Sequence, residues 1–421
     1  MKQPVWIVGA GIVGSASAYL LARAGHPVTL LEALDAPAQG TSFANGAQLS
    51  YSYVEPLATP ATLRKLPALL LDRHSPLRLR FTGEWSQLAW VWDFVRACNG
   101  RQVRHATRAL LSLAFLSRHE LSLACAADAL RFEHDTIGKL VLCPTAGGLR
   151  AAQRQVEFQR QLGCQQSLLS VDQCIAREPS LAAYADRFVG GVWTPGEAVG
   201  DARQLSQELI ARVQAMGGEV RYRTRITGFR CDGRRVTALR TSGGELPLLD
   251  DAAVVLANGN AAAATAASLG LRLPIYPVKG YSVTLPVTDP SRAPSVSVTD
   301  LRRKTVYAPL PGRLRIAGMA ELVGHDLRAD PRRIAHLVDC ARETFPGACD
   351  FDADPQPWAG LRPATPTSMP IIGSTPYDNL LLNVGHGALG FTLAMGSARL
   401  LARQLAGTQP DPVAEPFAYA A

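Results

Sequence analysis

The chain has 421 residues, 47% of them hydrophobic and 19% charged, a balance typical of a folded protein with room for two domains. The formal net charge of +8 permits contact with nucleic acid or anionic lipid, but no zinc-finger spacing and no basic helix followed by heptads is present, which argues against nucleic acid. The eight cysteines form no Cys-x-x-Cys pair and no cluster with histidine, so we expect free thiols in a reducing compartment and no metal site.

The N-terminus predicts a nucleotide site. Residues 5–8 form a short apolar strand, the turn "GAGIVG" supplies Gly9, Gly11 and Gly14, a helix follows, and a second strand ends at Glu32. Gly9 permits the turn, Gly11 lets a pyrophosphate approach the backbone, and Gly14 lets the helix pack on the strand. We therefore expect a dinucleotide, with phosphates at the helix N-terminus and ribose hydroxyls on Glu32. The motif does not choose between FAD and NAD, although its place at the start of a long chain favours FAD.

Residues 64–108 are unusually basic. Nine Lys or Arg face three acids, which gives 9 − 3 = +6 of the net charge, and Trp85, Trp90, Trp92 and Phe94 lie among them. Such a segment can lie on an anionic membrane surface. A helical lid whose aromatic residues pack on the protein has the same composition, and the sequence leaves both readings open. We find no segment that would span a bilayer, so we expect a cytoplasmic protein that at most lies on the inner face of the membrane.

The sequence of the second half of the chain predicts further strands and helices that extend the same α/β sheet. Residues 201–240 are typical of an amphipathic helix, a strand and a hairpin, and residues 252–260 of a buried strand. Residues 379–407 again predict a strand, a glycine-rich turn and a helix. That turn, from Gly385 to Gly390, directs backbone N–H groups and the positive end of a helix dipole at whatever lies in front of it. An ordinary strand-to-helix turn has the same spacing.

One arginine stands out in the stretch "WAGLRPATPTSMPIIG", from Trp358 to Gly373. Arg362 lies there between apolar and ring-locked neighbours. An unpaired charge out of water costs several kcal/mol, and the planar guanidinium fits a carboxylate best. We expect its partner to be either a carboxylate of this protein or the carboxylate of a ligand.

These motifs resemble a known family. The N-terminal motif, "TSFANGAQLS" (41–50), "YPVKGYSV" (276–283), the arginine stretch and "NVGHGALGFTLAMGSARLL" are similar, in order and over nearly the full length, to the bacterial D-amino acid dehydrogenase small subunits, within the D-amino-acid oxidase and glycine oxidase superfamily of flavoproteins. The resemblance implies an α/β fold, with a Rossmann-like FAD-binding domain of discontinuous segments and an α+β substrate domain built on a large antiparallel sheet. We expect the FAD-binding domain at 1–60, 196–275 and 350–421, and the substrate domain at 61–195 and 276–349.

The resemblance also implies roles for individual residues. Arg362 matches the arginine that binds the substrate carboxylate, and Tyr307 of "YAPLPGRLRIAG" matches a tyrosine that assists it. The residues expected to contact FAD are Gly9, Gly11, Gly14, Glu32, Ser42, Asn45, Gln48, Ile226, Gly385, His386, Gly387, Ala388, Leu389 and Gly390. Family members with covalent flavin use a cysteine near the arginine, and residues 358–373 contain none, so we expect non-covalent FAD.

The expected activity is oxidative deamination of D-amino acids to 2-oxo acids and ammonia, by hydride transfer to flavin N5, with the electrons passed to a quinone or another acceptor. A secondary amino acid such as D-proline, D-hydroxyproline or sarcosine is an alternative substrate. A flavoprotein subunit that only docks into a larger oxidoreductase is a further alternative, but such a subunit needs no carboxylate clamp. The chain has Asn45-Gly46-Ala47 where the family has Asn-Ala-Gly, which leaves the substrate preference open.

Overall fold

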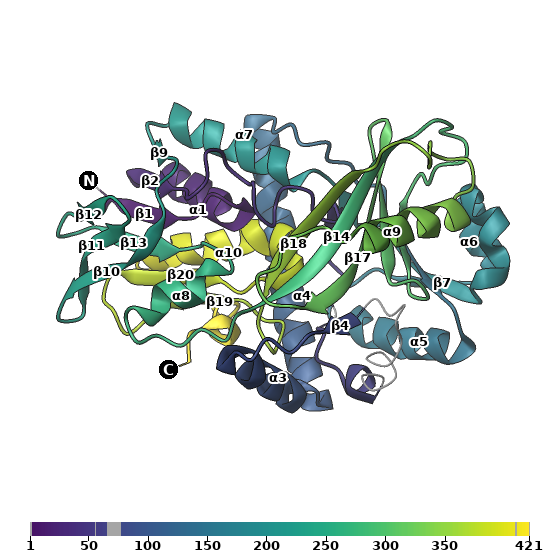
Figure 1. Cartoon of the computed structure of the whole chain (residues 1–421), viewed down its shortest axis with the longest axis horizontal. Helices are drawn as coiled ribbons and strands as arrows, with labels where there is room; N and C mark the ends of the chain where they lie inside the picture. Colours follow the sequence, from purple (N-terminus) through teal and green to yellow (C-terminus); the bar gives the residue numbers. More distant parts are fainter. Residues whose placement is uncertain (1, 55, 65–76, 409–410, 421) are drawn as a thin grey trace.

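Two sheets dominate the computed structural model, which describes residues 2–54, 56–64, 77–408 and 411–420. The sheet that contains the N-terminal strand lies on the left of Figure 1, and a larger, mostly antiparallel sheet lies on the right. The predicted α/β class with a second domain on a large antiparallel sheet is therefore confirmed.

The N-terminal sheet is six-stranded and mostly parallel. In spatial order its strands are β19 (Ile371–Ser374), β20 (Leu380–Val384), β13 (Ala253–Leu256), β1 (Val5–Val8), β2 (Val28–Leu31) and β9 (Glu219–Arg221). β1 pairs in parallel with both β2 and β13, and α1 (Ile12–Arg23) connects β1 to β2. The predicted strand, glycine turn, helix and strand are all present.

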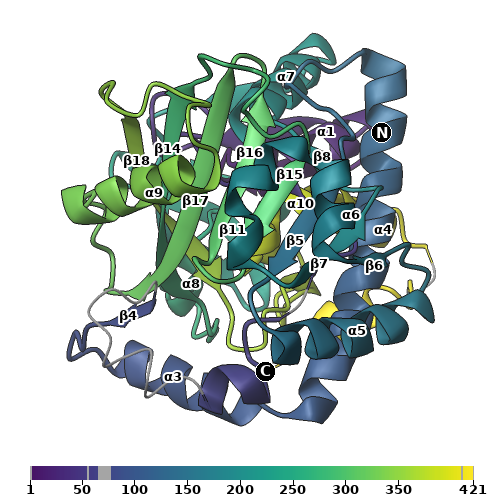
Figure 2. The same cartoon turned by 90° about the vertical axis from the view of Figure 1, so that its right-hand side faces the viewer.

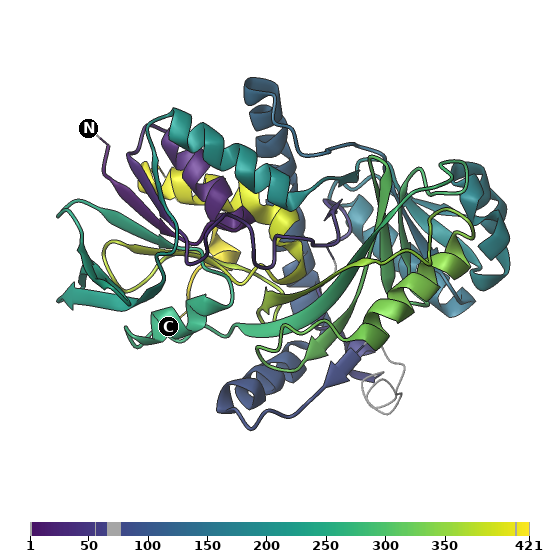
Figure 3. The same ribbon diagram turned by 45° about the horizontal axis from the view of Figure 1, so that its top comes forward.

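Both faces of this sheet are covered, which explains why its strands are almost continuously apolar. Val5 and Ile7 belong to a core shared with α1, α7 (Ala202–Ala215) and α10 (Gly390–Leu405), and Figure 3 shows these three helices side by side. Val8 faces a second core. That core contains residues of the three-stranded sheet β10 (Ile226–Asp232), β11 (Arg235–Thr241) and β12 (Gly244–Pro247), and of α8 (Ala261–Ala267).

The larger sheet is nine-stranded. Its order is β18 (Gln356–Ala364), β14 (Tyr276–Pro286), β17 (Arg313–Leu322), β16 (Thr305–Leu310), β15 (Ser297–Asp300), β5 (Lys139–Cys143), β7 (Gly190–Thr194) and β6 (Ser167–Leu169), with β4 (Leu77–Leu79) beside β17. α9 (Pro331–Thr344) packs on one face, over β14 and β17, as Figure 2 shows. The opposite face is left to form one wall of a cavity.

The remaining elements lie outside the sheets described above or connect them. They are β3 (Gln48–Leu49) with its partner β8 (Ala198–Val199), α3 (Trp85–Ala97), α4 (Gly100–Asp128), α5 (Ala146–Arg160), α6 (Val171–Arg177), η1 (Pro179–Arg187), η2 (Gly387–Leu389) and η3 (Glu415–Phe417). β3 and β8 form a small bridge, which extends the loop after β2 toward the larger sheet.

The elements do not follow the domain boundaries that the sequence suggested. β18, within the segment 350–421 assigned to the FAD-binding domain, is an edge strand of the nine-stranded sheet and pairs with β14 over its whole length. Conversely α4, assigned to the substrate domain, packs against α10 in the core of the first domain. A motif fixes where a segment lies in sequence but not which domain it joins. The pairing of β18 with β14 and the packing of α4 against α10 reveal these two placements.

The basic segment 64–108 has two sides. Residues 65–76 of this segment lie outside the described residues; the remainder forms β4, α3 and the start of α4. On α3, Trp90 is buried, stacks with Phe94 at 5.3 Å between ring centroids and donates its indole N–H to the carbonyl of Ala364 at 2.8 Å. Trp85 and Trp92 point outward and are 84% and 64% exposed. Trp90 and Phe94 thus pack against the protein, as the residues of a lid would, whereas Trp85 and Trp92 do not.

By length and hydropathy alone, α4 could cross a membrane, which the sequence reading did not anticipate. Half of its apolar window is nevertheless buried in the protein, and its side chains belong to the core with α1 and α10. A core helix passes the same test, so α4 by itself is weak support for a membrane span.

Candidate active site

A cavity of about 1020 Å³ runs between the two sheets. The glycine turn after β1 and the tip of β2 line one end, and the turn before α10 lines the middle. Arg362 of β18 and the exposed face of the nine-stranded sheet close it on the other side. Of the predicted site residues, Gly14 and Tyr307 alone do not line this cavity.

Each of the three glycines of the first turn lacks a side chain for a different physical reason. Gly9 has φ of +106°, and a Cβ there would lie 2.8 Å from the backbone of Asn258. A Cβ on Gly14 would lie 1.8 Å from the carbonyl oxygen of Gly9. A Cβ on Gly11 would meet only the hydroxyl of Ser42, at 3.5 Å, and the turn lines the cavity. The protein therefore needs Gly9 and Gly14 for its own fold, whereas the small size of Gly11 serves something outside the chain.

Donors and acceptors surround this turn. The N-cap residue of α1 is Gly11, which has no side chain to cap the helix, and the first N–H groups of a helix have no partner within the helix. Ser42 accepts from the N–H of Ile12 at 3.1 Å. The carboxylate of Glu32, at the tip of β2, accepts from the N–H groups of Ala10 at 2.7 Å and Leu34 at 3.0 Å. This places the acid beside the glycine turn, as the sequence predicted.

The rest of this end of the cavity comes from later segments. The N–H of Thr224 donates to the backbone carbonyl of Glu32 at 2.7 Å, so Ile226 at the start of β10 lies next to the tip of β2. Asn258 and Asn260 also line the cavity, and their buried Oδ1 atoms have no hydrogen-bond partner among the described residues. Buried polar atoms are normally paired. These acceptors therefore point to a polar ligand in the cavity.

The turn from Gly385 to Gly390 lies in the middle of the cavity. Gly385 has φ of +79°, and His386 forms a β-bridge with Ala364, which ties the turn to β18. Burial lowers the pKa of His386 to about 3, so its imidazole is neutral, and its Nε2 lies 3.2 Å from the hydroxyl of Ser397. Among the described residues, neither η2 nor α10 has a side-chain cap at its N-cap residue, and the start of a helix suits a negatively charged ligand group.

The loop before β3 brings Asn45 to the cavity, and β3 itself brings Gln48. Ala47 adopts φ of +53°, a conformation that favours glycine, and its N–H is held by the side chain of Asn45 at 3.1 Å. A residue with a Cβ in this conformation leaves strain of about 1 kcal/mol in the loop. A Cβ on Gly46 would make only ordinary contact with Val306, at 3.4 Å.

Arg362 lies over a gap that a glycine leaves. A Cβ on Gly280 of β14 would lie 2.3 Å from its Nη2, so the guanidinium occupies the space of the missing side chain. Its Nη1 donates to the carbonyl of Met319 at 2.8 Å. Burial alone lowers the pKa of Arg362 to about 10, so it remains charged at neutral pH. Within the described part of the chain, no carboxylate oxygen lies within 4.0 Å of this guanidinium.

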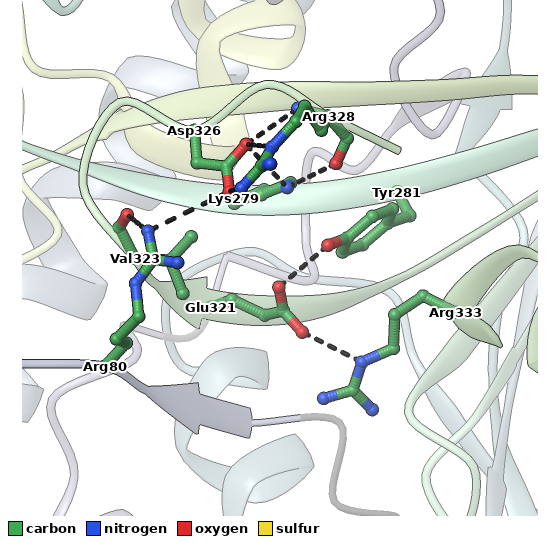
Figure 4. Close-up of polar contacts among 8 residues, drawn as sticks. All are labelled: Arg80, Lys279, Tyr281, Glu321, Val323, Asp326, Arg328 and Arg333. Atoms are coloured by element: carbon green, nitrogen blue, oxygen red, sulfur yellow. Dashed lines mark hydrogen bonds and ion pairs between the residues drawn. The ribbon is translucent and has the colours of Figure 1, made fainter. Parts of the chain in front are cut away.

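The Met319 carbonyl, which accepts from Arg362, lies beside a polar network on the opposite face of β14 (Figure 4). Met319 has φ of +66° and lies where β17 has an extra residue against β14. Tyr281 donates to Glu321 at 2.8 Å, and Arg333 donates to the same carboxylate at 2.9 Å. Lys279 donates to the carbonyl of Arg328 at 2.5 Å, in the loop after β17. The network fixes the irregular end of β17, whose Met319 carbonyl orients Arg362.

Tyr307 is not part of the cavity, which corrects the sequence prediction. Its side chain is 0% exposed, belongs to the core under α9, and its hydroxyl lies 3.0 Å from that of Thr344. Successive residues of a strand face opposite sides of a sheet. Val306 therefore faces the cavity, and Tyr307 faces away from it. The tyrosine motif identifies the strand correctly but not the face.

The sequence reading also missed a residue. Lys139, at the start of β5, is 3% exposed and lines the cavity. Its Nζ donates to Gln48 at 3.0 Å and to Ser50 at 2.9 Å. Tyr53 lines the cavity beside it, whereas Tyr51 is buried away from it. The only sequence signal was a lysine that opens the otherwise apolar strand "KLVLC".

These observations fit a bound dinucleotide whose far end lies beside Arg362. The Gly11 turn leaves room against an uncapped helix, and Glu32 lies where a ribose would reach it. The turn at 385–390 presents a second uncapped helix start halfway along the cavity. Within the described residues, no group of three or more His, Cys, Asp or Glu could hold a metal ion.

Comparison with known proteins agrees with this geometry. The chain is 47% identical to D-amino acid dehydrogenase 2 of Ralstonia nicotianae, over 99% of both chains, and 44% identical to D-amino acid dehydrogenase 2 of Pseudomonas aeruginosa, over 98% of this chain and 97% of that protein. The fold is similar to that of glycine oxidase from Geobacillus kaustophilus, with a TM-score of 0.78 and 22% identity over 100% of this chain and 98% of that one.

The family of FAD dependent oxidoreductases described as DAO matches residues 4–404. That span begins just before β1 and ends one residue before the end of α10, so it takes in both glycine turns, Glu32 and Arg362. The chain therefore belongs to the DAO family of FAD-dependent oxidoreductases.

Proposed function

We propose that this protein oxidises D-amino acids to 2-oxo acids and ammonia with non-covalently bound FAD. The observation that carries the proposal is Arg362, a charged guanidinium in the cavity wall that has no carboxylate partner among the described residues. The partner left to it is the α-carboxylate of a ligand. The names of the two relatives, at 47% and 44% identity, support a D-amino acid as that ligand.

The chain supplies binding surfaces for the cofactor. The turn at Gly9 and Gly11 with the start of α1 would hold the pyrophosphate, Glu32 would hold a ribose, and Ile226 would contact the adenosine end. The turn from Gly385 to Gly390 would contact the flavin ring, together with Asn45 and Gln48. When bound, the flavin accepts the α-hydrogen of the substrate with its two electrons.

The residues around the substrate orient it. A bidentate Arg362 fixes the carboxylate and, with the sheet beside it, limits how Cα can lie in the cavity. Val306, Ala317 and Gly280 give the sheet a small and mostly apolar surface there, which excludes water from the reacting carbon. Removal of the hydride leaves an imine, which water hydrolyses to the 2-oxo acid and ammonia. We assign no side-chain base to this reaction.

The test compares the amounts of 2-oxo acid and ammonia formed with the amount of dye reduced. Purified holoenzyme with a D-amino acid and an artificial dye acceptor should form one 2-oxo acid and one ammonia for each two-electron reduction of the dye. D-Proline, D-hydroxyproline and sarcosine belong in the same panel, because a secondary amine is the close alternative. A protein that holds FAD but reduces no dye with any of these compounds would instead be a docking subunit.

We further infer that the electrons pass to an acceptor at a membrane, with a quinone as the expected acceptor and the cytoplasmic side as the expected location. The segment β4–α3 exposes a set of large apolar side chains, namely Leu79, Phe81, Trp85, Leu88 and Trp92. Arg78, Arg80 and Arg96 are exposed around them. Exposed apolar side chains ringed by cations suit the surface of an anionic bilayer.

Replacing both Trp85 and Trp92 with serine should reduce binding to vesicles of phosphatidylglycerol about tenfold, because two rings leave the lipid interface. Binding of the unaltered protein should also weaken at high salt, since screening reduces the attraction of the arginines. Leu249→Ser is the matched control, because Leu249 is 65% exposed but lies in the loop after β12. Equal binding of all three proteins in a vesicle sedimentation assay would contradict this surface.

A further inference from the structure

A buried lysine lines the cavity. Lys139, at the start of β5, is 3% exposed. Its Nζ donates to Gln48 at 3.0 Å and to Ser50 at 2.9 Å, and it lies 4.5 Å from the centre of the Tyr53 ring. Gln48 is itself held in place, because its amide donates to the hydroxyl of Ser297 at 2.6 Å. The ammonium group therefore has a fixed position in the cavity wall.

Hydrogen bonds connect this lysine to the first turn of α10. The backbone N–H of Ser50 donates to the hydroxyl of Thr392 at 3.1 Å, and Thr392 is the third residue of α10. Ser50 thus contacts the lysine through its side chain and the helix through its backbone. Lys139, Ser50 and Thr392 all line the cavity. The lysine and the start of α10 therefore lie beside the same part of the cavity.

Both features carry positive charge. The N-terminus of a helix carries about half an elementary charge, and an ammonium group carries a whole one. The start of α10 has no side-chain cap at its N-cap residue. Together, the lysine and the helix favour a ligand group with negative charge in this part of the cavity.

The counter-charge of Lys139 lies behind it. Glu197 is 1% exposed, does not line the cavity, and its Oε1 accepts from the N–H of Ser52 at 2.7 Å. In the described part of the chain no carboxylate oxygen lies within 4.0 Å of the Nζ of Lys139. Glu197 thus compensates the cation only from a distance. The side of the lysine that remains for an anionic group is the cavity.

The flavin ring is the part of the expected ligand that gains charge here. In the proposed function, the ring contacts the turn from Gly385 to Gly390 together with Asn45 and Gln48, and Gln48 is a hydrogen-bond partner of Lys139. A hydride consists of two electrons and one proton, so a ring that has accepted it carries one more negative charge than the oxidised ring. A cation beside the ring stabilises this charge and so favours reduction.

We propose that Lys139 raises the reduction potential of the bound flavin by holding a positive charge beside the ring, together with the N-terminus of α10. Gln48 and Ser50 position the ammonium group for this role. The inference rests on the proposed function, because that function places the flavin ring at the turn before α10. Lys139 is then a residue that tunes the cofactor, whereas Arg362 binds the substrate.

The direct test measures the reduction potential of the flavin in purified holoenzyme at pH 7, by equilibration with a dye of known potential. Replacing Lys139 with methionine should lower the equilibrium constant for two-electron reduction about tenfold, which is equivalent to about 30 mV. Lys139→Arg should retain most of the potential, because it keeps the positive charge.

Lys279→Met is the matched control. Lys279 is also 3% exposed, but it belongs to the network on the opposite face of β14, where its Nζ lies 3.9 Å from a carboxylate oxygen of Asp326. Its replacement should leave the equilibrium constant for reduction within about twofold of that of the unaltered enzyme.

The unaltered enzyme offers a second measurement, because the charge of Lys139 should depend on pH. Burial lowers the pKa of Lys139 to about 8, and the charge of Glu197 opposes this shift. Lys139 is therefore a cation below about pH 8. The side chains around it are those of Glu197 and Tyr53, which can titrate, and the neutral side chains of Gln48, Ser50, Thr194 and Ser297.

A negative charge on the reduced ring raises the pKa of a lysine beside it. Above about pH 8, reduction should therefore add one proton to the ring and a second proton to the Nζ of Lys139. The potential of the unaltered enzyme should fall more steeply with pH above about 8 than below it. Lys139→Met should remove this change of slope.

Three results would overturn the inference. The first is an unaltered potential in Lys139→Met. The second is an equal loss in Lys139→Met and Lys139→Arg, which would mean that the lysine only holds Gln48 and Ser50 in place. The third, which needs no variant, is a constant slope of potential against pH through about pH 8 in the unaltered enzyme. A failure of the proposed function is distinguishable, because the potential is measured without any amino acid.

Discussion

Replacing Arg362 with alanine is expected to lower kcat/KM for a small D-amino acid roughly 30- to 1000-fold. This corresponds to a loss of about 2–4 kcal/mol of transition-state stabilisation. The physical reason is that the substrate carboxylate would then lie in a cavity with no charged partner. FAD content and thermal stability should change little, because the guanidinium pairs with no carboxylate among the described residues and donates only to the Met319 carbonyl there. Steady-state kinetics with FAD quantified spectroscopically measures both.

Three variants distinguish a role of Arg362 in substrate binding from a role in folding. Arg362→Lys should recover only part of the loss, because a point charge cannot make the bidentate contact. Gly280→Ala should mimic Arg362→Ala, because its Cβ would displace the flexible guanidinium while the strand remains intact. Tyr307→Phe should retain kcat/KM, because its hydroxyl contacts only Thr344 behind the sheet among the described residues. Undiminished turnover in Arg362→Ala would show that this arginine binds something other than the substrate.

Replacing Gly11 with valine is expected to yield a folded protein that does not bind FAD. A side chain at this position meets nothing closer than Ser42 at 3.5 Å in the protein, but it would occupy the space that a pyrophosphate needs. Loss of two charge-assisted hydrogen bonds corresponds to about 3 kcal/mol, or roughly a hundredfold in affinity. The ratio of flavin to protein absorbance after purification measures the effect, and circular dichroism reports the fold.

Gly14→Val is the matched control for this prediction. Its Cβ would lie 1.8 Å from the backbone of Gly9, so this variant should fail to fold rather than fold without flavin. If Gly11→Val is purified yellow with FAD in the usual ratio, the pyrophosphate does not lie against this turn. If both variants fail to fold, the distinction between the two glycines is wrong.

The sequence was most informative where a local motif determines its own geometry. The unit from β1 to Glu32 has its order, spacing and helix start determined within about thirty residues, and the same holds for the turn before α10. Arg362 could be singled out because a charge between apolar and ring-locked neighbours requires a partner. In each case the physical constraint is visible in neighbouring residues.

The remaining features depend on pairing between distant segments. Tyr307 lies on the expected strand, but the pairing of β16 with β15 and β17 decides which face it occupies. A shift of one residue in register reverses every side chain, and no local motif specifies that register. Lys139 meets Gln48 and Ser50 only because β5 and the segment around β3 converge, although they are about ninety residues apart in sequence. The place of β18 in the larger sheet likewise follows from its pairing with β14.

Anaerobic reduction of the bound flavin by paired enantiomers tests the central claim most directly. Purified holoenzyme would be mixed without oxygen with D- or L-alanine, and with D- or L-proline, and the loss of flavin absorbance followed in time. We predict that D-alanine bleaches the flavin, that L-alanine does so at a negligible rate, and that Arg362→Ala abolishes most of the difference by slowing the D-enantiomer. Equal rates of flavin reduction by the D- and L-enantiomers, or an unaltered rate in Arg362→Ala, would contradict the account.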